Sequence, residues 1–282
     1  MQLTDAAAVK KLLARHGFTF SKALGQNFLI NPSVCPRMAE SCGADPTTGV
    51  LEIGPGIGVL TKELAKRAAK VASIELDQRL IPVLNETLEE FDNISIISGD
   101  AMKLNLNELI AREFGDMPVV VCANLPYYIT SPLIMRLLEQ RLPLQSITVM
   151  VQKEAADRLC ARVGSRESGA VTVAVHFYAV PKRLFTVSPG SFLPPPRVDS
   201  AVLRMDLLEH PPVDADPKDL FRVVRAGFSQ RRKTLCNALS SSLPCTKEQA
   251  QAALASCGLT LTVRAEELSL EAFAALTKAL KQ

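Results

Sequence analysis

The sequence has no apolar run of about eighteen residues, which excludes an ordinary transmembrane helix. Its first seventeen residues carry charges throughout, as in a short amphipathic helix, and lack the basic start and apolar block of a secretory signal. None of the cysteine pairs has the two-residue spacing of zinc ligands or redox dithiols. The seven scattered cysteines instead favour reduced thiols. We therefore expect a cytoplasmic protein without a bound metal.

Histidine is also scarce, and the three histidines lie in no recognisable arrangement with other catalytic side chains. We expect His16, His176 and His210 to be structural or exposed. The net charge of +3 is too small to indicate a polyanionic partner by itself. Its distribution is more informative, because residues 216–234 hold six basic side chains against two acidic ones.

From residue 49 onward, apolar β-branched runs alternate with amphipathic stretches of helical spacing. The predicted strands are 50–53, 71–76, 94–97, 118–122 and 146–151. The predicted helices are 60–69, 78–90, 106–113 and 132–140. This alternation predicts a doubly wound, mostly parallel α/β sheet of the Rossmann type, with helices on both faces.

The alternation weakens after residue 153, where a helix-like stretch (154–163) is followed by apolar runs at 170–180 and 201–207. The proline-dense segment between those runs predicts an extended loop. A second break, EHPPVDADP, precedes a purely helical tail. We therefore predict two domains, residues 1–210 and a small all-α domain, 211–282.

The segment VLEIGPGIGVLTKEL leads from a predicted strand through a glycine-rich turn into a helix. Gly54, Gly56 and Gly58 permit positive φ and the close approach of a ligand to the main chain. The first crossover of a doubly wound sheet is where nucleotides bind. A tight turn without a ligand is the alternative.

Two acidic residues follow the next strands. Glu75 can accept hydrogen bonds from both hydroxyls of an adenosine ribose, and Asp77 competes with it for this role. Asp100 could accept from an adenine amino group, although an Asp after a Gly is often only a turn residue. These features fit NAD as well as S-adenosylmethionine.

The loop NLPYYITSP after the fourth strand separates the two cofactors. Attack by an adenine amine on a methyl sulfonium needs acceptors on its two N–H bonds, which the Asn124 side-chain oxygen and a nearby carbonyl can provide. Pro126 would stiffen the loop, and stacking of a flipped base on Tyr127 is worth roughly 1–3 kcal/mol. No strong general base is required. An NAD-dependent oxidoreductase would leave this loop unexplained.

With these motifs, the sequence resembles the small-subunit ribosomal RNA adenine dimethyltransferase family. The resemblance extends from KALGQNFL (22–29) through EIGPGIG, IELD, SGDAM and NLPYYITSP to SFLPPPRVDSAV and GFSQRRKTL. It implies that S-adenosylmethionine is the cofactor and that two adjacent adenines near the 3′ end of small-subunit (16S) RNA are each methylated twice. It also implies a partner, the 30S precursor, and a role in small-subunit biogenesis.

The resemblance also implies roles for individual residues. Asn124 would hold the target amine, with Tyr127 and Phe192 on either face of the base. The implied catalytic set is Asn124, Leu125, Pro126, Tyr127 and Phe192. The implied cofactor set is Asn27, Leu29, Gly54, Gly56, Glu75, Asp100, Ala101 and Asn124.

Basic residues near the start of the helical tail are candidates for RNA phosphate contacts. They are Arg222, Arg225, Arg231, Arg232 and Lys233, and they interleave with Phe221 and Phe228. A solvated helix face is the alternative. A second patch, comprising Lys10, Lys11, Arg15 and Lys22, is expected to be solvated.

Three other functions compete with this prediction. Macrolide-resistance methylases of large-subunit RNA share the entry motif, but the tail GFSQRRKTL favours the small subunit. DNA adenine methyltransferases typically have a second proline in place of Leu125. An assembly factor acting mainly by binding is the third. We expect a monomer, because no coiled-coil seam is visible.

Overall fold

The computed structural model describes residues 2–21, 24–230 and 232–281. The chain folds into two compact units. The first comprises the chain up to Ala156 together with Lys182–Leu207, and the second comprises Asp157–Pro181 together with the chain from Leu208 onward.

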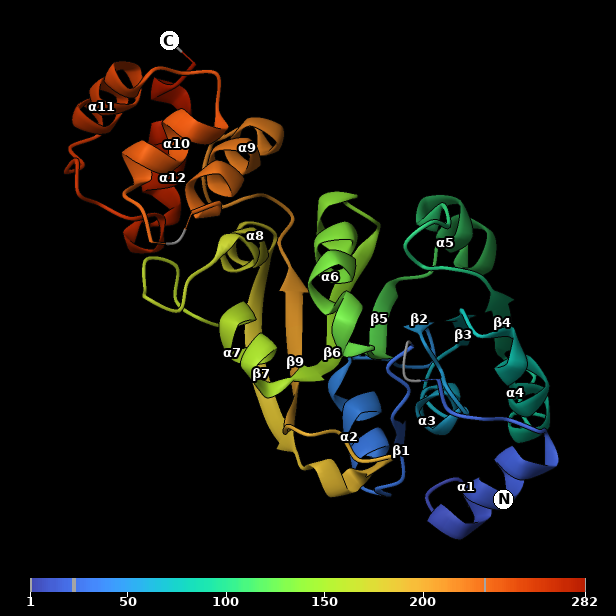
Figure 1. Cartoon of the computed structure of the whole chain (residues 1–282). Coiled ribbons are helices and arrows are strands. Elements are labelled where there is room, and N and C mark those ends of the chain that lie inside the picture. Colours follow the sequence, from blue (N-terminus) through green and yellow to red (C-terminus); the bar gives the residue numbers. More distant parts are fainter. Residues whose placement is uncertain (1, 22–23, 231, 282) are drawn as a thin grey trace. The chain divides into compact units, whose positions relative to one another are not determined.

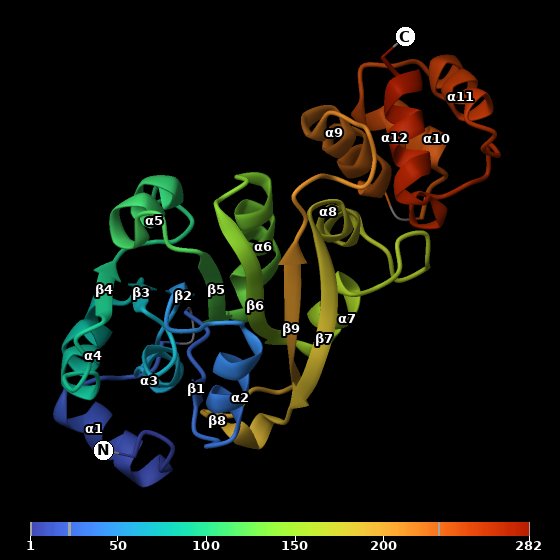
Figure 2. The ribbon, with the colours of Figure 1, turned by 180° about the vertical axis from the view of Figure 1, so that it is seen from behind.

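A seven-stranded sheet in the order β4-β3-β2-β5-β6-β9-β7 forms the centre of the first unit (Figure 1). Its parallel strands are β2 (Gly49–Ile53), β3 (Lys70–Glu75), β4 (Ile94–Ser98), β5 (Val119–Asn124) and β6 (Leu144–Gln152). The remaining strands are β9 (Ser200–Leu207), antiparallel to β6, and β7 (Ala179–Val187) at one edge (Figure 2). The predicted doubly wound, mostly parallel sheet is confirmed.

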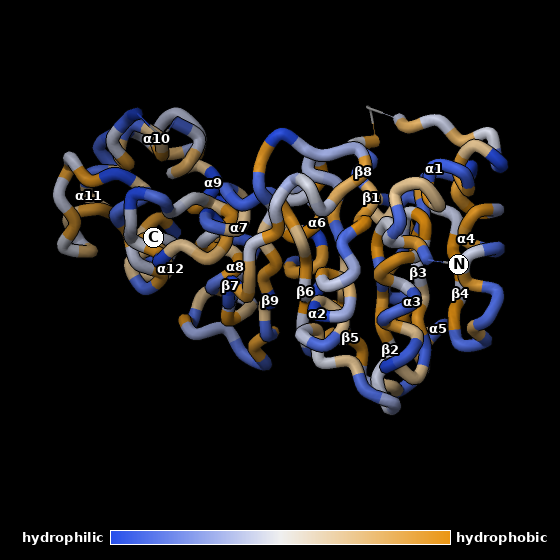
Figure 3. Tube along the Cα trace, turned by 90° about the horizontal axis from the view of Figure 1, so that it is seen from below, coloured by the Kyte–Doolittle hydropathy of each residue, from blue (hydrophilic) through white to orange (hydrophobic). Residues whose placement is uncertain are grey.

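Helices connect the parallel strands, and the predicted helices are present with small shifts at their ends. They are α3 (Val59–Ala65), α4 (Ile81–Thr87), α5 (Leu106–Phe114) and α6 (Thr130–Glu139). Two further helices, α1 (Ala6–Arg15) and α2 (Val34–Ser41), precede β2. β2 is buried along its whole length, and hydrophobic residues dominate the central strands in Figure 3. This is expected for strands covered on both faces.

β2 pairs with β3 on one side and with β5 on the other, so the strand order reverses between β2 and β5. The carboxyl ends of the strands on either side of such a switch point leave a crevice that no crossover helix fills. The glycine-rich turn follows β2 directly, so it lies at this crevice.

A two-stranded sheet was not predicted. β1 (Phe28–Leu29) pairs antiparallel with β8 (Phe192–Leu193), so that Leu29 faces Phe192. β8 lies within the proline-dense segment that the sequence predicts to be an extended loop. This pairing fixes the N-terminal segment to the region just before β9.

The second unit is mainly helical. Its helices are α8 (Ala170–Tyr178), α9 (Pro217–Phe228), α10 (Leu235–Ser242), α11 (Lys247–Ser256) and α12 (Leu270–Ala279), and α7 (Lys153–Leu159) runs across the division. The ring of Phe221 lies 5.3 Å from that of Phe177 and 5.6 Å from that of Tyr178. Because these rings share one core, residues 157–181 group with the tail, whereas the sequence placed them before a boundary near Pro211.

None of the helices in the described ranges is long and apolar enough to cross a membrane.

Candidate active site

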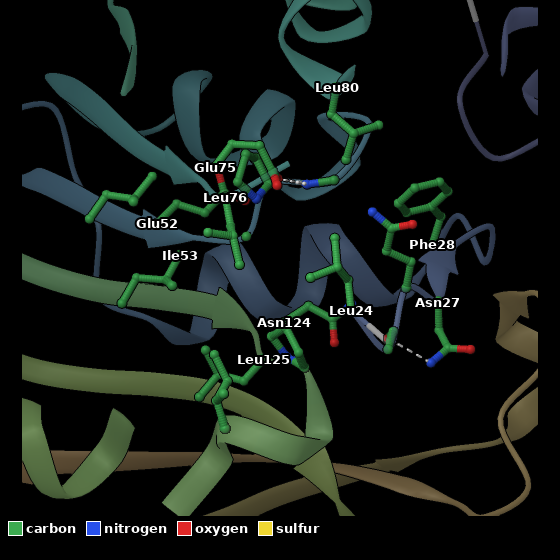
Figure 4. A pocket seen from close by; sticks show the side chains of 18 of the residues that line it. Leu24, Asn27, Phe28, Glu52, Ile53, Glu75, Leu76, Leu80, Asn124 and Leu125 are labelled. Carbon is green, nitrogen blue, oxygen red and sulfur yellow. Dashed lines mark hydrogen bonds between the residues drawn. The ribbon is translucent and has the colours of Figure 1, made fainter. Parts of the chain in front are cut away.

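A pocket opens at the carboxyl ends of β2, β3, β4 and β5, within the first unit. It encloses about 1070 Å³, including its open mouth. The twelve residues predicted for catalysis and cofactor binding all line it: Asn27, Leu29, Gly54, Gly56, Glu75, Asp100, Ala101, Asn124, Leu125, Pro126, Tyr127 and Phe192. Figure 4 shows Glu75 and Asn124 near the strand ends, with Leu24, Asn27 and Phe28 of the N-terminal segment across from them.

The glycine-rich turn has the backbone conformation that the sequence predicts. Gly54, Gly56 and Gly58 have φ of +72°, +60° and +87°. A Cβ atom on Gly56 would lie 3.1 Å from the Phe28 ring. Gly56 is therefore required both by its φ and by the close approach of the N-terminal segment.

We expect Gly56→Ala to destabilise the protein by about 1–3 kcal/mol, because it combines an unfavourable φ with displacement of Phe28. Gly17→Ala is the matched control, since Gly17 has φ +62° but no atom within 4 Å of its would-be Cβ. Chemical denaturation of both variants measures the difference. Equal losses would contradict the role given to Phe28.

Glu75 lies at the end of β3 with only 5% of its surface exposed. Its Oε2 accepts a hydrogen bond from the Gly56 amide at 3.4 Å, and its Oε1 accepts one from the Asp77 amide at 2.7 Å. Burial raises the pKa of Glu75 to about 7, against the opposite effect of these amides. Among the described residues, Glu75 lines the pocket and Asp77 does not.

Glu52 is a pocket residue that the sequence prediction missed. It lies on β2, is 1% exposed, and accepts hydrogen bonds from Thr61 Oγ1 at 2.7 Å and Ser73 Oγ at 2.6 Å. Burial raises the pKa of Glu52 to about 7. Its signal in the sequence was an acidic residue inside an otherwise apolar strand.

Glu52 makes the stability of the protein depend on pH. Its carboxyl holds a proton in the native state between pH 4.5 and about 7, where the unfolded chain has released it, so stability falls as pH rises through this range. Glu52→Gln keeps an acceptor for Thr61 and Ser73 but does not ionise. Between pH 5 and pH 8, we expect the free energy of unfolding of Glu52→Gln to rise by about 2–3 kcal/mol relative to that of the wild type. Denaturant titrations at both pH values test this, and a constant difference between the proteins would contradict it.

Asp100 follows β4, and its contact with an adenine amino group stays a prediction. Its Oδ1 accepts a hydrogen bond from the Met102 amide at 2.8 Å, so it stabilises a turn. The same residue and Ala101 also line the pocket.

The loop after β5 is fixed by several contacts. The buried Leu125 donates its amide to the Met150 carbonyl at 3.1 Å, and the Pro126 carbonyl accepts from the Ile129 amide at 3.2 Å. The Tyr127 hydroxyl lies 2.7 Å from Ser200 Oγ at the start of β9. Burial raises the pKa of Tyr127. The backbone around Asn124 is therefore held in place at the pocket.

Phe192 and Tyr128 both line the pocket but differ in the exposed fraction of their surface. Phe192 is 3% exposed and belongs to the hydrophobic core as well as to the pocket wall. Tyr128 also lines the pocket and is 52% exposed, although sequence reasoning gave it no role.

The predicted RNA-binding residues lie in the second unit. Arg222 and Arg225 are exposed on α9, Arg232 and Lys233 are exposed after it, and Arg231 lies outside the described residues. The two interleaved aromatic residues pack against other rings of the second unit. Phe221 is buried against Tyr178, and Phe228 packs 6.0 Å from Phe273.

The histidines lie elsewhere. His16 Nε2 is 2.7 Å from Glu86 Oε2, and His176 Nε2 is 2.9 Å from the Ala161 carbonyl. Within the described parts of the chain, no histidine lines the pocket, and no cluster of three His, Cys, Asp or Glu side chains could hold a metal.

The pocket residues fit an adenosyl cofactor. Glu75 offers a carboxylate at the strand end, the glycine turn leaves its main chain accessible, and Ile53, Ile74 and Leu76 supply apolar walls. Such a mixture of apolar surface and a few polar groups is typical of a cofactor site. S-adenosylmethionine, an adenosine that carries a methionine-derived sulfonium, is a cofactor with the polar and apolar parts that such a lining accommodates.

Comparisons with known proteins agree with this chemistry. The family model for ribosomal RNA adenine dimethylase matches residues 17–282. The ribosomal RNA small subunit methyltransferase A of Geobacillus thermodenitrificans is 47% identical over 276 residues, which are 96% of this chain and 94% of that protein.

Two solved structures are similar at 27% identity. A dimethyladenosine transferase from Plasmodium falciparum has a TM-score of 0.72 and covers 88% of this chain and 95% of its own. The 23S rRNA methyltransferase ErmE has a TM-score of 0.67, with 91% and 100% covered. The expected methyltransferase class and its cofactor, S-adenosylmethionine, are confirmed, and the chain belongs to the ribosomal RNA adenine dimethylase family.

Proposed function

We propose that this enzyme transfers methyl groups from S-adenosylmethionine to N6 of two adjacent adenines near the 3′ end of 16S RNA, in a precursor of the small subunit. The observation that carries the proposal is the pocket in which Glu75 and the glycine turn lie beside Asn124 and Tyr127. The relative from Geobacillus thermodenitrificans, named for the small subunit, supports this RNA over that of the large subunit.

Chain residues at the strand ends would hold the cofactor. Glu75 would accept hydrogen bonds from the two ribose hydroxyls, and Asp100 with Ala101 would border the adenine. Asn27 and Leu29 would border the methionine end. When bound, S-adenosylmethionine supplies an electrophilic methyl group on a positively charged sulfur.

The loop after β5 would prepare the amine for methylation. The Asn124 side-chain oxygen and a nearby main-chain carbonyl would accept its two N–H groups, drawing nitrogen toward tetrahedral geometry and stabilising the positive charge that develops. The contacts of Leu125 and Tyr127 hold these acceptors ready, so little reorganisation is needed. The proton is lost to water, because the amine becomes strongly acidic once alkylated.

Base recognition would use the aromatic side chains. Tyr127 would stack on a base lifted out of the RNA, and Phe192 would border its other face. Methylating one amine twice requires room for the first methyl group. The exposed residues Arg222, Arg225, Arg232 and Lys233, with Arg231, would bind RNA phosphates. We further propose that the protein acts as a cytoplasmic monomer.

Labelled methyl transfer tests this proposal. The acceptors are small subunits that lack the modification, large subunits and duplex DNA. We expect label on the small subunits alone. Label on large subunits would favour the macrolide-resistance type of enzyme, and label on duplex DNA would contradict an RNA substrate.

A further inference from the structure

The N-terminal segment, described at residues 18–21 and 24–29, borders the cofactor pocket. Residues 24–29 line the pocket. The segment is packed through the rings of Phe18, Phe20 and Phe28, whose centroids lie 5.4–6.0 Å apart. The Phe28 ring also lies against Gly56 of the glycine turn. The segment thus forms one wall of the site.

The Gln26 side chain ties this wall to the strand ends. Its Oε1 accepts a hydrogen bond from the Ser21 amide at 2.8 Å, within the segment itself. Its Nε2 donates to Asp77 Oδ2 at 2.8 Å, just beyond β3. Both ends of the amide are therefore used, and they connect the segment to the acidic residue that follows Glu75.

Asp77 is 7% exposed, and its carboxylate is saturated by groups that hold the segment. Arg79 Nε donates to Asp77 Oδ1 at 2.8 Å and Arg79 Nη2 donates to Oδ2 at 2.6 Å. Arg79 in turn donates to the Thr19 carbonyl at 3.4 Å, and its guanidinium lies 5.0 Å above the Phe18 ring. Arg79 holds the pKa of Asp77 below its usual range, so the carboxylate is charged at neutral pH.

The same residue is linked to Glu75, because the Asp77 amide donates to Glu75 Oε1 at 2.7 Å. The other oxygen of Glu75 accepts from the Gly56 amide, against which Phe28 packs. The N-terminal wall and the carboxylate assigned to the ribose therefore belong to one network. Hydrogen bonds and the approach of Phe28 to Gly56 connect the wall to this carboxylate.

We propose that Gln26, Asp77 and Arg79 form a latch that holds the N-terminal segment against the pocket, and that Asp77 is a positioning residue for cofactor binding. The latch rests on the proposed cofactor site. It gives Asp77 a task different from the ribose contact for which it competed with Glu75 in the sequence. A side chain that only stabilised the fold would not couple the mobility of residues 24–29 to the affinity for S-adenosylmethionine.

A reversal of the hydrogen bond tests the latch. Gln26→Glu places a second carboxylate against Asp77, so we expect S-adenosylmethionine affinity, measured by calorimetry, to fall about tenfold or more. Amide hydrogen exchange of residues 24–29 should increase. Gln78→Glu, at an exposed position next to Asp77, is the matched control for added charge.

The outcomes separate the latch from the cofactor site. If Glu75→Gln weakens affinity but Gln26→Glu does not, the latch is wrong and the site stands. If Glu75→Gln binds as the wild type does, the cofactor site itself fails. Gln26→Ala, which removes the contact without adding charge, gives the same test should Gln26→Glu fail to fold.

Discussion

Asn124→Ala should reduce methyl transfer to small subunits by about 10²–10³-fold, the usual effect of removing one group that stabilises developing charge. The loss should be in the rate of the chemical step, because the side chain acts on the amine as the methyl group arrives. The rest of the loop should persist, since Leu125 and Tyr127 are fixed through Met150 and Ser200. Single-turnover transfer with saturating small subunits measures this step.

Asn124→Asp is the informative companion variant, because it keeps an acceptor oxygen at the same place. It should retain more activity than Asn124→Ala. An Asn124→Ala protein that transfers methyl groups at the wild-type rate would remove the proposed mechanism. If Asn124→Ala loses activity only because it no longer binds S-adenosylmethionine, the role of Asn124 is cofactor binding and not catalysis.

Glu75→Gln should weaken S-adenosylmethionine binding by about 10–100-fold, because hydrogen bonds to a charged acceptor contribute about 1.5–3 kcal/mol. The pKa of Glu75 is raised to about 7 by burial, so the carboxyl of the free protein gains a proton as pH falls through 7. A protonated carboxyl is a poorer acceptor for two hydroxyls. The affinity of the wild type should therefore fall between pH 8 and pH 6.

The variant provides the control for this pH dependence. Glu75→Gln does not ionise, so its affinity should change less over the same range. Calorimetric titration of both proteins at pH 6, 7 and 8 gives the comparison. A wild-type affinity that rises on acidification would contradict the ribose contact assigned to Glu75.

The sheet and the glycine turn were predictable because their signals are local. Alternating apolar runs and helical stretches define β2, β3 and β5, and glycines at 54, 56 and 58 indicate positive φ. Parallel strands then bring their carboxyl ends to one edge. Glu75, Asp100 and Asn124 each end or follow such a strand, and the structure has all three in one pocket.

The parts that were missed depend on contacts between distant residues. The pairing of Phe28 with Leu193 involves strands of two residues each, which are too short to show a period. The apolar stretch Ala170–Tyr178 is a helix, yet it is hydrophobic all round and shows no amphipathic spacing. Phe221 and Phe228 lie beside basic residues in the sequence, but Phe221 is buried in the core of the second unit and the partly buried Phe228 packs against Phe273.

The basic tail shows a further limit of sequence reasoning. Arg222 Nη2 lies 3.8 Å from Asp219 Oδ1. Such an exposed ion pair contributes little to stability, so Arg222 remains available to bind a phosphate. The two roles considered for these exposed cations are RNA binding and a solvated helix face. The salt dependence of binding to small subunits distinguishes the two, because each lost phosphate contact lowers that dependence.

The central claim is that the loop beginning at Asn124 presents a flipped adenine amine to the cofactor bound beside Glu75. Its most direct test is mapping of the bases methylated in 16S RNA by the purified protein, on small subunits that lack the modification. We predict N6,N6-dimethyladenosine at two adjacent positions near the 3′ end, and none with Asn124→Ala. Methylation at a different atom or base, or an unchanged pattern with Asn124→Ala, would contradict the claim.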